Sequence, residues 1–160
     1  MGEKKGELRF MRLAIREAEK NLRLTRGGPF GACIVNKGQV LAVARNTVLA
    51  GDPTGHAEIN AIRMAAKRLK KYDLTGCTIY STTEPCPMCF SAVHWAKIDC
   101  LIFGTGISDV KKRGFNELTV SNRLLKKMGK SRVKIIKGFA RGECLELLEK
   151  WDQLPKKITY

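Results

Sequence analysis

Short apolar runs and longer segments with helical periodicity alternate along the chain, and this alternation restricts the fold more than any other feature. The predicted strands span residues 30–37, 39–48, 78–81, 100–104 and 132–137. The predicted helices span residues 8–24, 56–72, 86–97, 115–128 and 141–154. A tight turn joins the first two strands as a hairpin, whereas a helix separates each later pair, as parallel strands require. The pattern predicts an α/β fold, a three-layer α/β/α sandwich around a five-stranded mixed sheet.

The length of 160 residues suits one compact domain, so residues 1–160 are expected to form a single domain. No apolar run approaches the roughly 18 residues of a membrane span, and the charged start does not resemble an export signal. Six cysteines without such a signal are typical of a reducing compartment, where they serve as ligands or redox groups more often than as bridges. We therefore expect a cytoplasmic protein with no membrane partner.

Positive charge is concentrated in the last third of the chain. The formal net charge is +15, and residues 111–160 contain 14 Lys or Arg against 5 Asp or Glu. Such an excess permits partners that carry phosphates, including nucleic acids. A Lys-rich surface is equally typical of proteins from thermophiles. The charge therefore admits an RNA partner without requiring one.

Two short motifs begin consecutive predicted helices and carry the chemistry. His-Ala-Glu at residues 56–58 begins one helix, and Pro-Cys-Pro-Met-Cys at residues 85–89 begins the next. Cys86, Cys89 and His56 make three protein ligands for zinc, and a three-ligand site is catalytic because its fourth position stays open to water. Glu58 can move a proton without ligating the metal. The motifs predict a zinc-dependent hydrolytic enzyme with one Zn²⁺ ion per subunit.

Each motif alone has another interpretation. Cys86 and Cys89 could form a redox dithiol, which would leave the His-Ala-Glu motif unexplained. The same ligands could hold a structural zinc ion in a non-catalytic RNA-binding module, but such a module has no need of Glu58. The cysteines at positions 33, 77, 100 and 144 are interpreted as small buried hydrophobic residues, and His94 as a structural residue.

The combination of H-x-E and P-C-x-x-C is the signature of zinc-dependent nucleobase deaminases, and nearly the whole chain resembles the cytidine deaminase superfamily in element order. The resemblance implies a cytidine deaminase-like fold and hydrolytic removal of an exocyclic amine from a base. Guanine deaminases of the bacterial type and tRNA adenosine deaminases both share these motifs. In both groups an asparagine that matches Asn46 hydrogen-bonds the base. We expect backbone groups near Ala57 to help orient the base in this chain.

Three aromatic residues favour the guanine deaminases. Phe30, within Gly-Gly-Pro-Phe-Gly-Ala at residues 27–32, and Trp95 resemble the aromatic walls of that family's base pocket. Tyr160 resembles a terminal tyrosine that closes the partner subunit's site on a swapped tail, so residues 155–160 are expected to be exchanged in a homodimer. Aromatic faces suit a free purine, which has no sugar or phosphate to add affinity.

Two further carboxylates are candidates for proton transfer. Glu117 aligns with an acid that assists proton transfer and recognises the purine in guanine deaminases, and it is a departure with a longer side chain if the family residue is Asp. Glu84 is interpreted either as a proton shuttle or as a cap of the zinc helix. The expected reaction is conversion of free guanine to xanthine with release of ammonia. Conversion of the tRNA wobble adenosine to inosine is the alternative, because residues 102–148 resemble the tRNA enzymes as well, and cytosine is a third candidate base.

Overall fold

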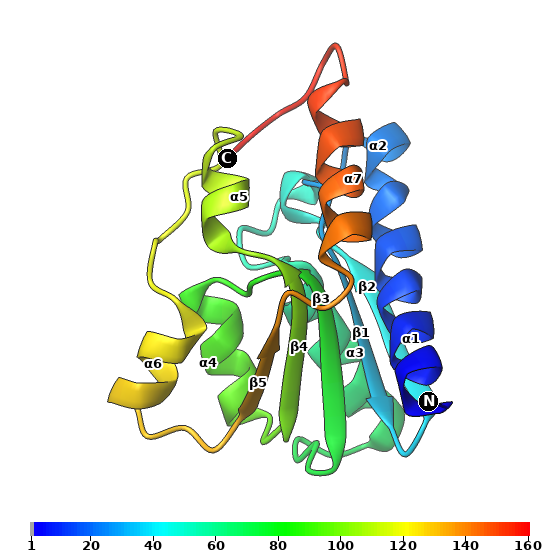
Figure 1. The fold of residues 1–160 in the computed structure, drawn as a ribbon, viewed down its shortest axis with the longest axis vertical. Coiled ribbons are helices and arrows are strands. Elements are labelled where there is room, and N and C mark those ends of the chain that lie inside the picture. The colour runs from blue at the N-terminus through cyan, green and yellow to red at the C-terminus, as the bar shows by residue number, and fades with distance from the viewer. Residues whose placement is uncertain (1) are drawn as a thin grey trace.

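The computed structural model of the chain describes residues 2–160, with side chains from Leu8 onward. The described strands are β1 (Gly31–Asn36), β2 (Gln39–Arg45), β3 (Cys77–Thr83), β4 (Cys100–Thr105) and β5 (Lys134–Lys137). They form one sheet in the order β2-β1-β3-β4-β5 (Figure 1). β1 pairs antiparallel with β2 and with β3, whereas β3, β4 and β5 run parallel. The predicted five-stranded mixed sheet is confirmed.

Helices cover both faces of this sheet (Figure 1). They are α1 (Gly2–Glu19), α2 (Asn21–Leu24), α3 (Ala57–Leu69), α4 (Pro87–Trp95), α5 (Ile107–Lys111), α6 (Asn122–Met128) and α7 (Arg141–Asp152), with a 3₁₀ turn, η1 (Val48–Ala50). α1 and α7 pack on one face, and α3 and α4 on the other. No helix within residues 2–160 has the length and apolar character needed to cross a membrane.

The alternation of side chains along β1 explains the two helical layers. Successive residues of a strand point to opposite faces of its sheet. Ala32 and Ile34 belong to the core cluster on the α3 side, whereas Cys33 and Val35 belong to the cluster on the α1 side. All four side chains are buried. A strand that is apolar on both faces therefore requires helices on both, as the sequence predicted.

Several elements differ from the prediction. The helix expected over residues 8–24 begins at Gly2 and is interrupted at Lys20, and α5 was not predicted. The helix expected over residues 115–128 begins only at Asn122, because Ser121 accepts a hydrogen bond from the Leu124 N–H (3.2 Å) and caps the helix there. Residues 115–121 form a loop instead. The second strand ends at Arg45, because the Asn46 side chain accepts a hydrogen bond from the Val48 N–H (3.0 Å) and turns the chain into η1.

Candidate active site

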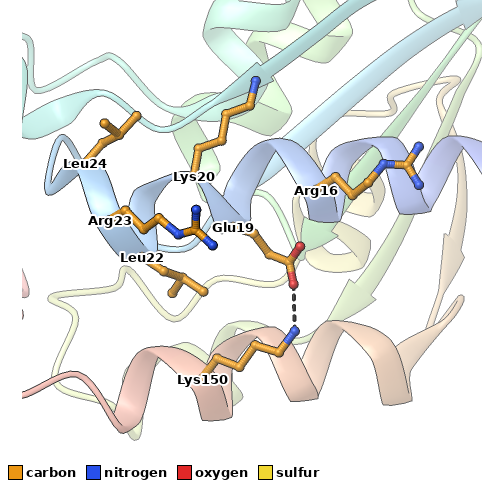
Figure 2. A pocket seen from close by; sticks show the side chains of 7 residues that line it. All are labelled: Arg16, Glu19, Lys20, Leu22, Arg23, Leu24 and Lys150. Atoms are coloured by element: carbon orange, nitrogen blue, oxygen red, sulfur yellow. Dashed lines mark hydrogen bonds and ion pairs between the residues drawn. The ribbon is translucent and has the colours of Figure 1, made fainter.

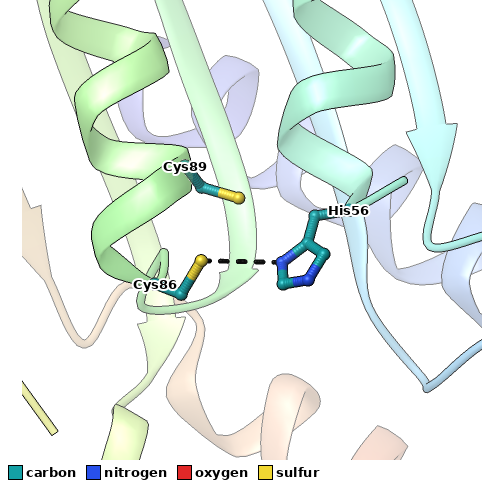
Figure 3. A group of neighbouring side chains, drawn as sticks. All are labelled: His56, Cys86 and Cys89. Carbon is teal, nitrogen blue, oxygen red and sulfur yellow. Dashed lines mark hydrogen bonds between the residues drawn. The ribbon is translucent and has the colours of Figure 1, made fainter. Parts of the chain in front are cut away.

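The starts of α3 and α4 bring three metal-ligand side chains together. His56 is the N-cap residue of α3, and Cys86 is the N-cap residue of α4. His56 Nδ1 lies 3.6 Å from Cys86 Sγ, and Cys89 lies one turn further along α4. The ligand atoms of the three residues all lie within 4.8 Å of one another. Figure 3 shows their side chains converging from the two helix starts.

The chemistry of these donors fits a zinc ion. Hydrogen bonds from Cys89 and His56 lower the pKa of Cys86 to about 4, so its sulfur is a thiolate at neutral pH. Thiolate and imidazole are the ligands that zinc prefers, and three of them leave a fourth position free. Within the described residues, no other group of His, Cys, Asp and Glu side chains is arranged to hold a metal ion.

Glu58 lies in the first turn of α3, two residues after the ligand histidine. Its side chain is buried, and its Oε1 accepts a hydrogen bond from the Ser81 hydroxyl (2.7 Å). Burial raises the pKa of Glu58, because a carboxylate loses solvation in the core. A buried carboxyl group fixed in this way can hold a proton close to the metal ligands.

Beside the ligands lies a cavity of about 20 Å³. Its lining residues are Phe30, Asn46, His56, Glu58, Thr83, Glu84, Cys86, Glu117 and Tyr160. All of these except Thr83 were expected from the sequence, and Ala57 is buried next to them at the start of α3. The free space holds about one water molecule, so a base can enter only if a lining residue moves.

Tyr160, from the C-terminal tail of the same chain, is the lining residue that closes this cavity. Its hydroxyl accepts a hydrogen bond from the Gly28 N–H (3.0 Å), and its carbonyl accepts one from the Asn116 N–H (2.9 Å). Its ring packs edge-on against Phe115, with ring centroids 5.5 Å apart. Burial raises the pKa of Tyr160, so the hydroxyl is neutral. The tail is thus held by both sides of the cavity.

Glu117 enters the cavity from the loop that follows α5. Burial, together with the negative charge of Cys86, raises its pKa to about 6. This value lies close to neutrality, where a carboxyl group can both take up and release a proton.

Glu84 lines the cavity, but one of its oxygens has a structural partner. Oε1 accepts a hydrogen bond from the Asn122 N–H (2.9 Å), and the Asn122 side chain donates to the Pro85 carbonyl (2.6 Å). The interpretation of Glu84 as a cap of the zinc helix is therefore wrong, because the helix it caps is α6. This contact also ties α6 to the turn that precedes the first zinc cysteine.

Trp95 does not join the site of its own chain. It is the last residue of α4, whereas the ligands belong to the first turn of that helix, and its side chain is 79% exposed. It is not among the residues that line the cavity. The prediction of Trp95 as an aromatic wall is thus not met within one chain, where Phe30 and Tyr160 provide the aromatic surface.

Asn21 supports the site and has no signature in the sequence. Its Nδ2 donates hydrogen bonds to the Gly28 and Asn46 carbonyls, both at 2.8 Å, and its side chain is fully buried. A Cβ atom on Gly27 would collide with the Asn46 side chain, so glycine is required at this close approach. Asn21 therefore holds together the two segments that carry Phe30, Asn46 and the Tyr160 contact.

Comparison with known families agrees with this geometry. Residues 4–105 match the family model of the cytidine and deoxycytidylate deaminase zinc-binding region. The chain therefore belongs to the cytidine and deoxycytidylate deaminase family, whose members carry a zinc-binding deaminase domain.

Individual relatives are named for several substrates, which include guanine, tRNA adenosine and cytosine. The chain is 39% identical over 109 residues to guanine deaminase of Bacillus subtilis (strain 168), covering 68% of this chain and 70% of the relative. It is 36% identical over 121 residues to tRNA-specific adenosine deaminase of Buchnera aphidicola subsp. Schizaphis graminum (strain Sg), covering 75% and 77%. The solved structure of guanine deaminase from Nitrosomonas europaea has a TM-score of 0.80 at 26% identity, covering 89% of this chain and 82% of that one. The cytidine deaminase-like fold is confirmed.

Proposed function

We propose that this deaminase converts free guanine and water into xanthine and ammonia. The observation that carries the proposal is the position of Tyr160, which closes the cavity beside the metal ligands. A free base can be enclosed completely by such a tail. A base within RNA needs an open path for its sugar and phosphates, which a closed tail would obstruct. The likeness to two guanine deaminases supports the same substrate.

The carboxyl groups in the cavity favour guanine over adenine. Guanine carries an N1–H donor next to the carbon that bears its amine, whereas the corresponding adenine nitrogen is an acceptor. We propose that the Glu117 carboxylate accepts the N1–H hydrogen bond and that the Asn46 amide donates to an acceptor on the base. An acceptor nitrogen placed against a buried carboxylate would leave both groups without a donor, which costs about 1–3 kcal/mol for each unpaired group.

Proton transfer is assigned to Glu58, with Glu117 and Glu84 as further carriers. In the reaction, the oxygen of water bonds to C2 of guanine, and the bond from C2 to its exocyclic amine nitrogen breaks. Glu58 takes a proton from the water and passes it to the amine, which leaves as ammonia, and the second proton of the water ends on N3 of xanthine. Phe30 and Tyr160 pack on the base and exclude bulk water, and backbone groups near Ala57 help to orient it.

We propose that His56, Cys86 and Cys89 hold one Zn²⁺ ion per subunit. When bound, zinc lowers the pKa of water toward neutrality and so supplies a nucleophile. Glu58→Gln removes the proton carrier but none of the ligands, so zinc content should be unchanged. Ammonia release should fall by about 10²-fold or more. Zinc analysis beside an ammonia assay checks this, and undiminished turnover in zinc-loaded Glu58→Gln would exclude the assigned role.

The substrate itself is tested by ammonia release from guanine, cytosine, adenine, adenosine and an anticodon stem-loop RNA. We expect release from guanine alone. Release from the stem-loop without release from guanine would replace the proposal with tRNA adenosine deamination. Zinc binding without release from any substrate would favour a non-catalytic module.

We also propose that the protein acts in the cytoplasm as a homodimer with exchanged tails. Six free cysteines are consistent with a reducing compartment. Within one chain the tail closes its own cavity, and an exchanged tail can make the same contacts in the partner. Light scattering after gel filtration measures the mass, and a monomer at micromolar concentration would contradict the dimer.

A further inference from the structure

We propose that the groove between α6 and β5, with the loop that joins them, binds the phosphate backbone of a nucleic acid strand outside the active site. The groove has a volume of about 690 Å³ and is lined by Arg123, Lys126, Lys127 and Lys137, together with Leu124 and Ile135. It shares no residue with the active-site cavity. Phosphate binding and base turnover are therefore separable properties.

The charge around this groove has one sign. Residues 118–142 contain eight Lys or Arg and no Asp or Glu. The lining of the groove includes four of the basic side chains and no acidic one. A concave surface of uniform positive charge attracts a linear polyanion and raises its local concentration.

The basic side chains here have no acidic partners. Among the described side chains, no carboxylate lies within 4.0 Å of a Lys or Arg between residues 122 and 137. Thermophile surfaces combine their charges into ion-pair networks, which this segment lacks. Lysines on an edge strand also prevent that strand from pairing with other sheets. This role can explain the lysines of β5, but not the basic residues of α6. The unpaired charge is therefore available for an external anion.

A second basic groove provides the contrast. The groove between α1–α2 and α7 is lined by Arg16, Lys20, Arg23 and Lys150, but also by Glu19 (Figure 2). Lys150 donates to Glu19 there (2.7 Å). Basic residues alone thus do not distinguish the α6–β5 groove, whereas the absence of acidic partners does.

The surface continues around the loop toward α4. Lys130 and Arg132 line a neighbouring cavity with His94, Lys97 and Asp99. Lys97 is paired there with Asp73 (3.1 Å), so the unpaired positive charge on this side comes from Lys130 and Arg132. The His94 ring lies 3.0 Å from the Ser131 hydroxyl and 6.2 Å, between centroids, from the ring of Trp95. An exposed aromatic ring beside basic residues suits the stacking of an unpaired base. The active site does not explain why Trp95 is exposed, whereas a role in base stacking on this surface does.

A single strand fits this surface better than a membrane does. Membrane-binding surfaces present an apolar face that enters the lipid, with the basic residues around it. Here four basic side chains line a hollow, and of the exposed apolar residues of α6, Leu124 and Met128, only Leu124 is in its lining. The exposed Trp95 ring lies beside His94, which lines the neighbouring cavity. The basic residues extend along α6, the loop after it and β5, and such an extended surface suits a linear ligand.

The test is fluorescence anisotropy with a labelled single-stranded RNA over a series of salt concentrations. Arg123→Glu/Lys127→Glu reverses two exposed charges of the groove. Arg16→Glu/Arg23→Glu makes the same change in net charge in the contrasting groove. We expect the groove variant to bind about tenfold more weakly or worse, and the control to change much less. The slope of log Kd against log salt should fall by about 0.7 for each phosphate that the variant no longer neutralises.

Trp95→Ala should weaken binding about fivefold or more without changing the salt slope, because stacking involves no counterion release. Ammonia release and thermal stability of the groove variant should match those of the unmodified protein, which separates this proposal from the deaminase assignment. Equal weakening in both double variants would overturn the proposal, as would the absence of salt-dependent RNA binding. Tighter binding to phosphatidylserine vesicles than to RNA would also overturn it.

Discussion

The Glu117 carboxyl group has a different pKa in the folded protein and in the unfolded chain, so its contribution to stability depends on pH. Burial, with the charge of Cys86, raises its pKa from 4.5 to about 6. The folded protein therefore binds more protons than the unfolded chain between these values. The stability contributed by this group is full below pH 4.5 and is lost as the pH rises through 6.

Glutamine does not titrate, so Glu117→Gln does not lose this stability. The variant should therefore gain stability relative to the unmodified protein as the pH rises from about 4.5 to 6.5. The gain is at most about 2 kcal/mol, the equivalent of the pKa shift. Thermal denaturation of both metal-free proteins across this range measures it. Glu146→Gln, exposed on α7, is the matched control. A Glu117→Gln difference that is constant with pH would contradict the raised pKa.

Asn21 offers a test of positioning. Asn21→Leu leaves the Asn46 carbonyl without its donor, whereas the Gly28 carbonyl still accepts from the Phe30 N–H (2.8 Å). The variant should therefore destabilise the fold by about 1–3 kcal/mol. The KM for guanine should rise more than kcat falls, because Asn46 loses its support and the zinc ligands do not. Steady-state kinetics and zinc analysis measure these effects. Asn21→Ser, which keeps a hydroxyl donor, should recover part of the KM. A fall in kcat with unchanged KM would rule out positioning of Asn46.

Metal ligands and supporting residues differ in how far the sequence reveals them. His56, Cys86 and Cys89 could be predicted because zinc requires particular side chains, and their spacing at helix starts is visible in the chain. The partners of Asn21 are backbone carbonyls, which leave no pattern. Trp95 was assigned to the base pocket because it resembles an aromatic residue of the guanine deaminases. At about 100° per residue, its side chain points well away from that of Cys89, six residues earlier.

At the level of elements, the C-terminal tail is the part whose removal has the clearest expected effect. Deleting residues 156–160 removes Tyr160 and opens the cavity. Activity on free guanine should fall at least about tenfold, because the base loses an aromatic contact and its shielding from water. Ammonia assays measure this, and a protein that is equally active without its tail would contradict the closing role.

Exchange of the tail is tested by mixing subunits. Glu58→Gln keeps the tail but lacks the proton carrier, and the deletion variant keeps the carrier but lacks the tail. If tails are exchanged, a mixed dimer restores one complete site, and mixing should recover activity. No recovery from a mixture shown to form mixed dimers would place each tail in its own subunit.

The elements could be predicted where apolar periodicity was regular. The sheet strands and the helices that pack on them followed from such patterns. The segment 115–128 was predicted as one helix, but the Ser121 cap sets the start, and residues 115–121 form the loop that carries Glu117. Loop contacts with a distant chain end, such as Asn116 with Tyr160, have no local signal.

Across the whole molecule, a zinc ion would join the two helices on one face of the sheet. His56 belongs to the start of α3, and both cysteines belong to α4. Removing zinc with a chelator should therefore lower stability, by about 2.7 kcal/mol if the free zinc is normally a hundredfold above its Kd. For a chain of this size the Tm should fall by about 2–4 °C for each kcal/mol.

Calorimetry with and without chelator measures this shift. Cys89→Ser, which lacks one ligand, is the control and should respond less. The prediction fails if chelator lowers the Tm of both proteins equally.

The amount of positive charge could be read from the sequence, but its position on the surface could not be predicted, because only the fold places α6 against β5.

The ionised sulfur of Cys86 also affects how the protein must be handled at the bench. Burial raises the pKa of Cys33 and Cys144 to about 12, so these thiols are inert toward oxidants at neutral pH. The lowered pKa makes Cys86 a thiolate when no metal is bound, so we expect it to react with peroxide or alkylating reagents before the other two thiols. Samples stripped of zinc should thus be oxidised first at Cys86, and a sulfenic acid there would prevent zinc from binding again. A reductant belongs in every buffer that contains a chelator.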